Sequence, residues 1–354
     1  MNRLALLLTA LAVLAGCASG PPPAATDGSI ALANLDAQIR QQGDDPGALE
    51  LWLLRLQFLA DAGMLDRIAA LADASAATPA ERLRRARARM ALHRFTDAEA
   101  DLDAGAATPA QRAALLVATG RAAEALPVLR AHAARQPGFA SLDALARAEA
   151  AAGHLEAADG LYAQALDRLD TTSPFPAAAI AFARGLMWSE QGGDPERGAR
   201  AYAQALGLVP EFAAAGVHLA ELDLARGDVA AAEARLLWVV IHTGELEALA
   251  RLGELHRRQG DVARGNDEIA AAGRRYEALL ARHPAAFADH AAEFYLGPGA
   301  DPERAWTWAQ ANLRERPTRR AYRLAVRAAE ATGRPDEARA LRDRMQARHP
   351  PRAA

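Results

Sequence analysis

Two stretches of the chain repeat one pattern. "GGDPERGARAYAQAL" runs from Gly192 to Leu206 and "GADPERAWTWAQANL" from Gly299 to Leu313, with their Asp-Pro-Glu-Arg words 107 residues apart. In each word Asp can cap a helix, Pro can take the first helical position, where no amide hydrogen is needed, and Glu suits the first turn. A chain that starts helices at a fixed spacing is expected to fold as an array of similar helical units.

Other turns divide this interval into three units of roughly 35 residues. The predicted turn positions are Gly63, His93, Gly120, Gly153, Gly193, Gly227, Gly260, Ala300 and Gly333. Five residues after each stand Ile68, Ala98, Ala125, Ala158, Gly198, Ala232, Gly265, Ala305 and Ala338, eight of which are Ala or Gly. Four residues beyond the small position come Leu102, Leu129, Tyr162, Tyr202, Leu236 and Ile269. A small residue lets the second helix of a pair approach the first, and the large residue fills the space beside it.

This spacing, with a proline seventeen residues after four of the turns, resembles the tetratricopeptide family from about residue 46 to 350. The early Trp of that family is missing here. The resemblance implies an all-α fold, a right-handed alpha-alpha superhelix of about eight or nine helix pairs. Composition agrees, because Ala, Leu, Arg and Glu dominate and all favour helices. We expect the array to occupy residues 30–350, followed by a disordered tail at 351–354.

The N-terminal units are shorter, and their helix starts are marked by capping boxes. Thr78 with Glu81 recurs 30 residues later as Thr108 with Gln111, each pair with Pro at the first helical position. The last predicted helix, near 336–348, is highly charged and is typical of a solvated cap. The five Trp residues are expected to fill the core (Trp52, Trp188, Trp238, Trp306 and Trp308).

The chain begins with MNRLALLLTALAVLAGCASG, in which Arg3 precedes a short apolar run. The run is too short to span a bilayer, so residues 1–16 are predicted to be a signal peptide. Leu14-Ala15-Gly16-Cys17 contains the only cysteine and resembles the lipobox of bacterial lipoproteins. The resemblance implies that the Cys17 thiol is lipidated, the leader is cut before it, and the new amino terminus is acylated. An ordinary secreted protein whose leader contains Cys is the alternative.

Residue 18 is Ala rather than Asp. In the lipoprotein family this implies the outer membrane of a Gram-negative cell, with the protein facing the periplasm. Two or three acyl chains anchor a protein to a membrane far more stably than one chain does. Residues 17–29 are small and Pro-rich, and they are expected to form a flexible tether between the lipid and the folded body.

Charge and motifs argue against several functions. The net charge is −3, without the basic excess of a nucleic-acid-binding protein. No H-E-x-x-H, G-x-S-x-G or P-loop pattern occurs. His283 and His290 are seven residues apart, but Pro284 ends a helix between them, while His93 and His256 are expected to be exposed. We therefore expect no enzyme, no metal site and no small-molecule cofactor.

Without a catalytic motif, a binding surface is the remaining candidate for function. A curved array exposes a concave face lined by the first helix of each pair. The predicted inward residues are Arg87, Arg147, Glu221, Glu254, Arg257, His290, Phe294, Arg320, Arg323 and Arg327. The stretch RRAYRLAVR, which contains the last three arginines, is the densest positive patch. It is suited to clamping a carboxylate or acidic segment by bidentate contacts. The alternative interpretation is an ordinary solvated face.

The hypothesis that follows is a non-enzymatic scaffold that binds protein or peptide partners in the periplasm and is held at the membrane by its lipid. In the resembled family such lipoproteins serve as adaptors for cell-wall hydrolases and proteases, or as assembly factors for pili, secretins and polysaccharide export. An accessory or degenerate enzyme acting on peptidoglycan or glycan stays open and would need converging carboxylates in a cleft. A periplasmic holdase stays open as well and would need an apolar groove.

Overall fold

A computed structural model describes residues 26–349 of the chain; the predicted signal peptide, Cys17, most of the tether and the tail lie outside them. The described residues form α-helices and contain no strand. The helices are α1 Gly28–Gln42, α2 Leu49–Leu59, α3 Gly63–Asp73, α4 Pro79–Ala91, α5 Phe95–Ala104, α6 Pro109–Ala118, α7 Ala122–Arg135, α8 Phe139–Ala152, α9 Leu155–Leu166, α10 Phe175–Leu186, α11 Pro195–Leu208, α12 Ala213–Ala225, α13 Val229–His242, α14 Leu246–Arg258, α15 Val262–Arg282, α16 Pro284–Leu296, α17 Pro302–Glu315, α18 Arg319–Ala331 and α19 Pro335–Arg348. A 3-10 turn, η1 (Pro46–Ala48), precedes α2, and a π-helical turn, η2 (Met187–Gly192), follows α10.

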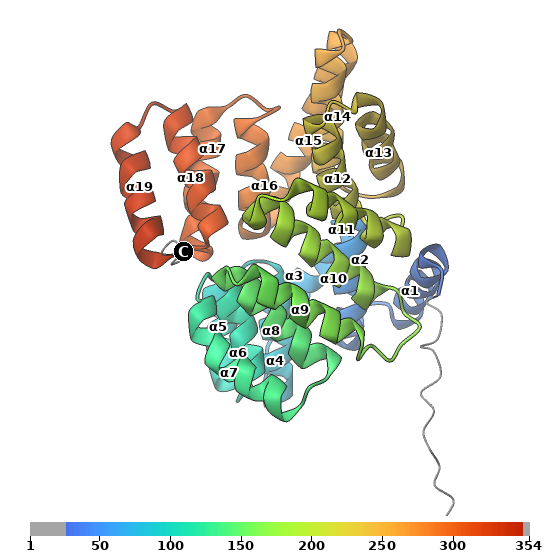
Figure 1. Ribbon diagram of the computed structural model, residues 1–354, viewed down its shortest axis with the longest axis vertical. Coiled ribbons are helices and arrows are strands. Elements are labelled where there is room, and N and C mark those ends of the chain that lie inside the picture. The colour runs from blue at the N-terminus through green and yellow to red at the C-terminus, as the bar shows by residue number, and fades with distance from the viewer. Residues whose placement is uncertain (1–25, 350–354) are drawn as a thin grey trace, which may run out of the picture.

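From α2 onward, consecutive helices pack in nine pairs, α2 with α3 through to α18 with α19, and each pair lies beside the next (Figure 1). The helix α1 precedes the first pair. The predicted all-α solenoid of about eight or nine helix pairs is therefore confirmed. The helix α15 is the longest among residues 26–349, at 21 residues, so the array is irregular around the α15–α16 connection.

The predicted turns are visible in the backbone as residues in the left-handed region. Eight of the nine predicted positions have positive φ, including the non-glycine residues His93 at 56° and Ala300 at 48°. Gly63 is the exception, because it is the first residue of α3 and Ala60 takes the left-handed conformation instead. The Asp61 side chain accepts a hydrogen bond from the Gly63 amide at 2.9 Å, which starts the helix.

The small position after each turn is buried as the pattern predicts. All nine residues are buried, and the large residues that follow four positions later are at most 9% exposed. The two glycines of this set, Gly198 and Gly265, mark very close approaches. A Cβ atom on Gly265 would stand 2.4 Å from the carbonyl oxygen of Gly253, so α14 and α15 touch backbone to backbone there.

The predicted helix starts are capped as expected. Both capping boxes, Thr78 with Glu81 and Thr108 with Gln111, make both of their hydrogen bonds. At the start of the array, α1 begins at Gly28, two residues before the expected boundary at 30. Asp27 caps it, and the amide of Thr26 donates to the carbonyl of Thr172 at 2.7 Å. The folded body therefore includes residues that we assigned to the tether.

The expectations for Trp238 and His256 are wrong. Trp238 is 45% exposed on the outside of α13, whereas Trp52 and Trp188 are buried. Trp238 lies on a row of α13 that faces away from the neighbouring helix pairs. His256, expected to be exposed, is 2% exposed, because its Nδ1 lies 2.6 Å from a carboxylate oxygen of Glu268 on α15.

The array closes on itself through contacts between its first pairs and its later ones. Phe58 of α2 packs against Phe175 and Phe212 with ring centroids 4.8 and 4.5 Å apart. The amide of Gly244 donates to the carbonyl of Leu59 at 2.9 Å. In Figure 1, α2 and α3 lie at the centre of the molecule. The chain therefore covers part of its own concave surface, and the continuous open groove implied by the repeat pattern is not present there.

We call the contacts of the first helices with the segment from α13 to α17 the closure seam. Its residues are Leu59, Asp66 and His93 on one side, and Gly244, His283, Ala285 and Arg316 on the other. In the seam Asp66 accepts from His283 at 2.9 Å and from Arg282 at 2.6 Å. A cavity of about 250 Å³, lined largely by apolar side chains such as Leu65, Leu279 and Phe287, lies along it.

Candidate binding site

A second cavity, of about 210 Å³, lies where the α4–α5 turn meets α16 and the α17–α18 connection. Its lining residues are His93, Asp289, His290, Asn312, Arg316, Thr318, Arg320, Ala321 and Leu324. The closure of the array brings His93 to this cavity from almost 200 residues upstream. There its Nδ1 lies 3.3 Å from the carbonyl oxygen of Ala285. We call this cavity the arginine pocket, after Arg316 and Arg320.

The His93 ring is neutral in this setting. Its Nε2 lies 3.4 Å from Nη1 of Arg316, which carries only donor hydrogens, so Nε2 accepts and Nδ1 donates to Ala285. Burial, together with the Arg316 charge, lowers the pKa of His93 to about 4. The side chain thus contacts Arg316 without adding positive charge to the pocket.

Arg316 is held loosely. Its Nη1 is 3.4 Å from Oδ2 of Asp289, and its guanidinium carbon is 5.9 Å from the centre of the Phe95 ring. The Nε atom is buried, and among residues 26–349 it has no hydrogen-bond partner. Burial lowers the pKa of the Arg316 guanidinium, although Asp289 opposes this effect. A buried donor without an acceptor is costly, and an incoming oxygen atom would satisfy it.

Arg320 has no direct partner at all in the part of the chain that the structure describes: no hydrogen bond and no ion pair within 4.0 Å. Burial lowers its pKa, but the carboxylates of Glu190 and Asp289 and others around it raise the pKa overall. Its charge is therefore balanced at a distance, while its five donor hydrogens stay available.

Asp289 and His290 complete the charge pattern. Burial acts to raise the pKa of Asp289, but His290, His93 and the two arginines lower it to about 2, so this carboxylate is ionised. Burial acts to lower the pKa of His290, but Asp289 and Glu247 raise it overall. The lining of the pocket thus holds two arginines and a readily protonated histidine with one carboxylate, while Glu247, 3.9 Å from His290, and other carboxylates stand around it.

The neighbouring part of the concave face is acidic. Arg251 of α14 lies 2.7 Å from Glu221, 3.2 Å from Glu247 and 4.0 Å from Glu254. Burial raises the pKa of Glu221, but His218 and Arg251 lower it overall, whereas a general acid needs a raised pKa. The cavity beside Arg251 is only about 10 Å³, enough for one water molecule and not for a sugar ring.

The structure brings some of the predicted inward residues together. His290 and Arg320 line the arginine pocket, and Glu221 and Glu254 meet at Arg251. Arg327 pairs with Glu293 beside them, and Arg323 is exposed on the same helix.

The other predicted inward residues lie apart from the pocket. Arg147 pairs with Asp143 at 2.9 Å on α8, and Arg87 pairs with Glu50 at 2.7 Å on α4. Phe294 is 6% exposed and packs on Tyr276, so it belongs to the core. Arg257 lies against α15, because its Cγ is 2.5 Å from where a Cβ of Gly265 would be.

Reasoning from the sequence missed His93, Asp289, Arg316 and Arg251 as members of the concave surface. Arg251 stands three residues before Glu254 and four after Glu247, so helical spacing alone places it beside both. Asp289 directly precedes His290, which was predicted. No sequence signal places His93 beside Arg316, since 223 positions separate them and only the closure of the array joins them.

Comparison with known proteins gives no family. No protein-family model matches the chain, and no curated protein matches it. Among solved structures it is similar to the APC/C hetero-tetramer Cut9–Hcn1, at 13% identity over 92% of this chain and 64% of that one, with a TM-score of 0.47. It is also similar to the human IFIT1 dimer with PPP-AAAA (15% identity, 86% and 71%, TM-score 0.43) and to BtubC from P. vanneervenii (17%, 67% and 95%, 0.29). The helix pairs of the chain itself establish its fold.

The low pKa of His93 predicts a pH effect on stability. A histidine that is neutral when folded, with a pKa of about 4 against an ordinary 6.5, gives its full stabilisation above pH 6.5 and loses it as the pH falls toward 4. In denaturant titrations we expect the midpoint of the wild type to fall more steeply over that window than that of His93→Asn. Asparagine tolerates the left-handed backbone and does not titrate. Asp289, His290 and Arg316 stay in both proteins, so parallel curves would contradict the assignment.

Proposed function

We propose that this protein is a non-enzymatic, lipid-anchored scaffold of the Gram-negative cell envelope. It is held by Cys17 at the periplasmic face of the outer membrane and binds an acidic segment of a protein or peptide partner in the arginine pocket. The observation that carries the binding role is the arginine pocket of about 210 Å³, in which the Nε of Arg316 is buried without an acceptor and the exposed Arg320 has no direct partner among residues 26–349.

The chemistry of the pocket selects the ligand class. Arg320 can bind a carboxylate with two parallel hydrogen bonds, and the unsatisfied Nε of Arg316 offers a further donor. The acidic surface around Arg251 lies next to the pocket and disfavours a long, uniformly acidic ligand. A partner segment with an isolated carboxylate, or a chain end, followed by basic or neutral residues therefore fits best.

The alternative roles are less well supported by the site. The carboxylates near Arg251 are held in ion pairs, which suits a structural cluster better than acid–base catalysis on glycans. A holdase would need an apolar groove on the concave face, and the arginine pocket is lined by charged and polar side chains.

The test is a titration of the full chain with short peptides that carry a single Asp, Glu or free terminal carboxylate. Their amidated and Lys-containing counterparts serve as reference ligands. Arg320→Gln is expected to weaken binding at least about tenfold, the value of a charge-assisted contact. Arg314→Gln, an exposed arginine on α17 outside the pocket, should leave the affinity unchanged. Equal affinities for the wild type and Arg320→Gln would contradict the proposal, as would equal binding of the amidated peptides.

A further inference from the structure

The outward face of α13 is apolar from Ala230 to Ile241. Its exposed residues are Val229, Ala230, Ala234, Leu237, Trp238, Ile241 and His242. Leu237 is 40% exposed, Trp238 45% and Ile241 65%. No Asp, Glu or Arg lies in this row; Glu233 and Arg235 are half-buried beside it. We call the row from Ala230 to Ile241 the α13 stripe.

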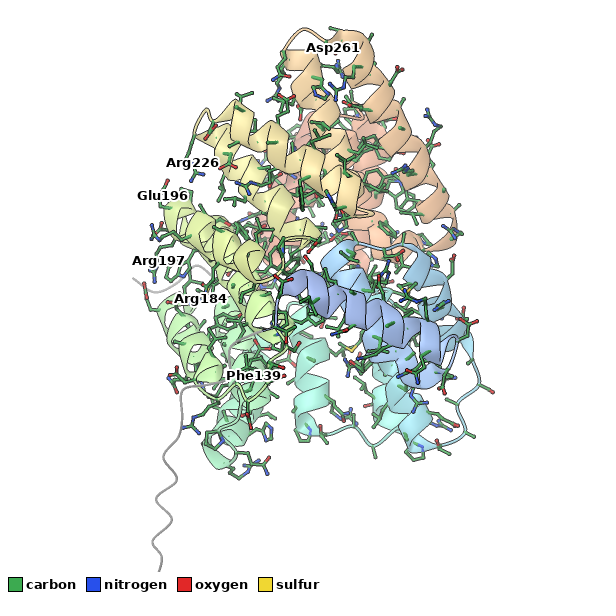
Figure 2. All side chains as sticks on the ribbon, turned by 90° about the vertical axis from the view of Figure 1, so that its right-hand side faces the viewer. Phe139, Arg184, Glu196, Arg197, Arg226 and Asp261 are labelled. Atoms are coloured by element: carbon green, nitrogen blue, oxygen red, sulfur yellow. The ribbon has the colours of Figure 1, made fainter. Side chains whose placement is uncertain are left out.

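The surrounding outer surface is different. Along the turns of α11 and α12, Arg197 pairs with Glu156 at 3.0 Å, and Arg226 lies 3.7 Å from Glu196. Figure 2 shows Glu196, Arg197 and Arg226 along one edge of the face that is turned to the viewer. A solvated helix normally carries such charges, so an uncharged exposed row of large apolar residues calls for a covering surface.

The folded chain begins beside the α13 stripe. Gly28 packs against the end of α11, where a Cβ atom would stand 2.4 Å from the carbonyl oxygen of Leu208 and 3.1 Å from Pro210. Pro210 and Trp238 line one hollow of about 410 Å³ together with Leu206. In Figure 1, α1 and α13 both lie on the right-hand side of the molecule.

Eight residues lie between Cys17 and Thr26, the first described residue. Fully extended, the nine Cα-to-Cα steps from Cys17 to Thr26 span about 30 Å at most. A lipid on Cys17 therefore keeps the bilayer within that reach of the start of α1, which contacts Pro210 on the rim of the hollow that Trp238 also lines.

We infer that the α13 stripe lies on the surface of the lipid bilayer and fixes the orientation of the anchored protein. This rests on the proposed lipid attachment of Cys17. None of the helices among residues 26–349 is long and apolar enough to cross a bilayer. A stripe of this kind enters the interface sideways, with Trp238 at the headgroup level that tryptophan favours.

A second copy of the chain fits the stripe less well. A stable protein interface uses about 20–30 residues on each side, whereas the stripe offers five, two of them alanines. A lipid surface needs no such area, because the acyl anchor supplies most of the attachment and the stripe only sets the orientation.

Two measurements on the full-length protein separate the anchor from the docking. Flotation with vesicles of phosphatidylethanolamine and phosphatidylglycerol compares the wild type with Cys17→Ser and tests the anchor alone. Quenching of tryptophan fluorescence by brominated acyl chains in the same vesicles tests the docking. We expect most of the quenching to be lost in Trp238→Phe and retained in Trp306→Phe, a half-buried tryptophan on α17.

Wild-type protein that floats but shows equal quenching in both variants would overturn the inference and leave the anchor intact. If the wild type does not float, the anchor is wrong, and quenching with vesicles in excess still decides whether Trp238 meets lipid. A dimer in vesicle-free solution that becomes monomeric in Trp238→Gln/Ile241→Gln would assign the stripe to self-association and overturn the inference. Val128→Gln, an exposed apolar residue on α7, is the matched control for that variant.

Discussion

Replacing Phe58 by alanine is expected to lower the free energy of unfolding by about 3–5 kcal/mol, the cost of removing a buried phenylalanine. Phe58 is completely buried and touches two other aromatic rings, those of Phe175 and Phe212, at 4.8 and 4.5 Å. These rings lie at the starts of α10 and α12, so Phe58 holds the first helix pair against the middle of the array. Its loss leaves a cavity that neighbouring aromatic side chains cannot fill without moving the α2 backbone.

The Phe58→Ala result is read from denaturant unfolding together with hydrogen exchange over residues 49–73. We expect exchange there to accelerate more than elsewhere, because the first pair loses its contact with α10 and α12. Phe139→Ala is the matched control, since Phe139 is half-buried at the start of α8 and packs in a different hydrophobic cluster from that of Phe58. Equal losses in the two variants would show that Phe58 has no special role in closure.

A single methyl group on Gly265 is expected to cost about 1–3 kcal/mol, the range for overpacking a tight core. The Cβ would stand 2.4 Å from the Gly253 carbonyl oxygen and 2.9 Å from the Arg257 amide nitrogen. Both are backbone atoms of α14, so a side-chain rotation cannot relieve the contact. Gly265→Ala therefore forces α14 and α15 apart, which thermal unfolding would report as a lower transition temperature.

Gly160→Ala is the control for this substitution. Gly160 lies inside α9 with nothing within 4 Å of its would-be Cβ, and alanine favours helix there by up to about 1 kcal/mol. The two substitutions should thus shift the transition in opposite directions. A stabilised Gly265→Ala protein would contradict the close approach of α14 and α15.

Local features of the fold followed from the sequence because they depend on neighbouring residues. The capping box at Thr78 needs only Glu81, and the caps at Asp194 and Asp301 need only the next turn of helix. The small residue after each turn is set by packing within one helix pair. The same register places a turn at Ala300, and Ala300 has a positive φ although it is not glycine.

Features that depend on distant repeats did not follow. The His93 imidazole was expected in solvent because its own turn gives it no cover, yet α16 and Arg316 enclose it. Arg257 was placed inward by a uniform register, whereas the glycines at 253 and 265 let α15 come so close that Arg257 packs against it. Trp238 was expected in the core with the other tryptophans, but its side chain on α13 faces outward.

The closure seam also changes how this array must assemble. A simple solenoid can add one repeat at a time, since each unit touches only its neighbours. Here Asp66 binds His283 across 217 positions, and the first pair completes its packing only when α14–α16 are present. Contacts between residues so far apart in the sequence slow folding and join early helices of the array to late ones. The first helix pair therefore completes its packing only after α14–α16 have formed, and a chain cut short before α14 would leave part of that pair uncovered.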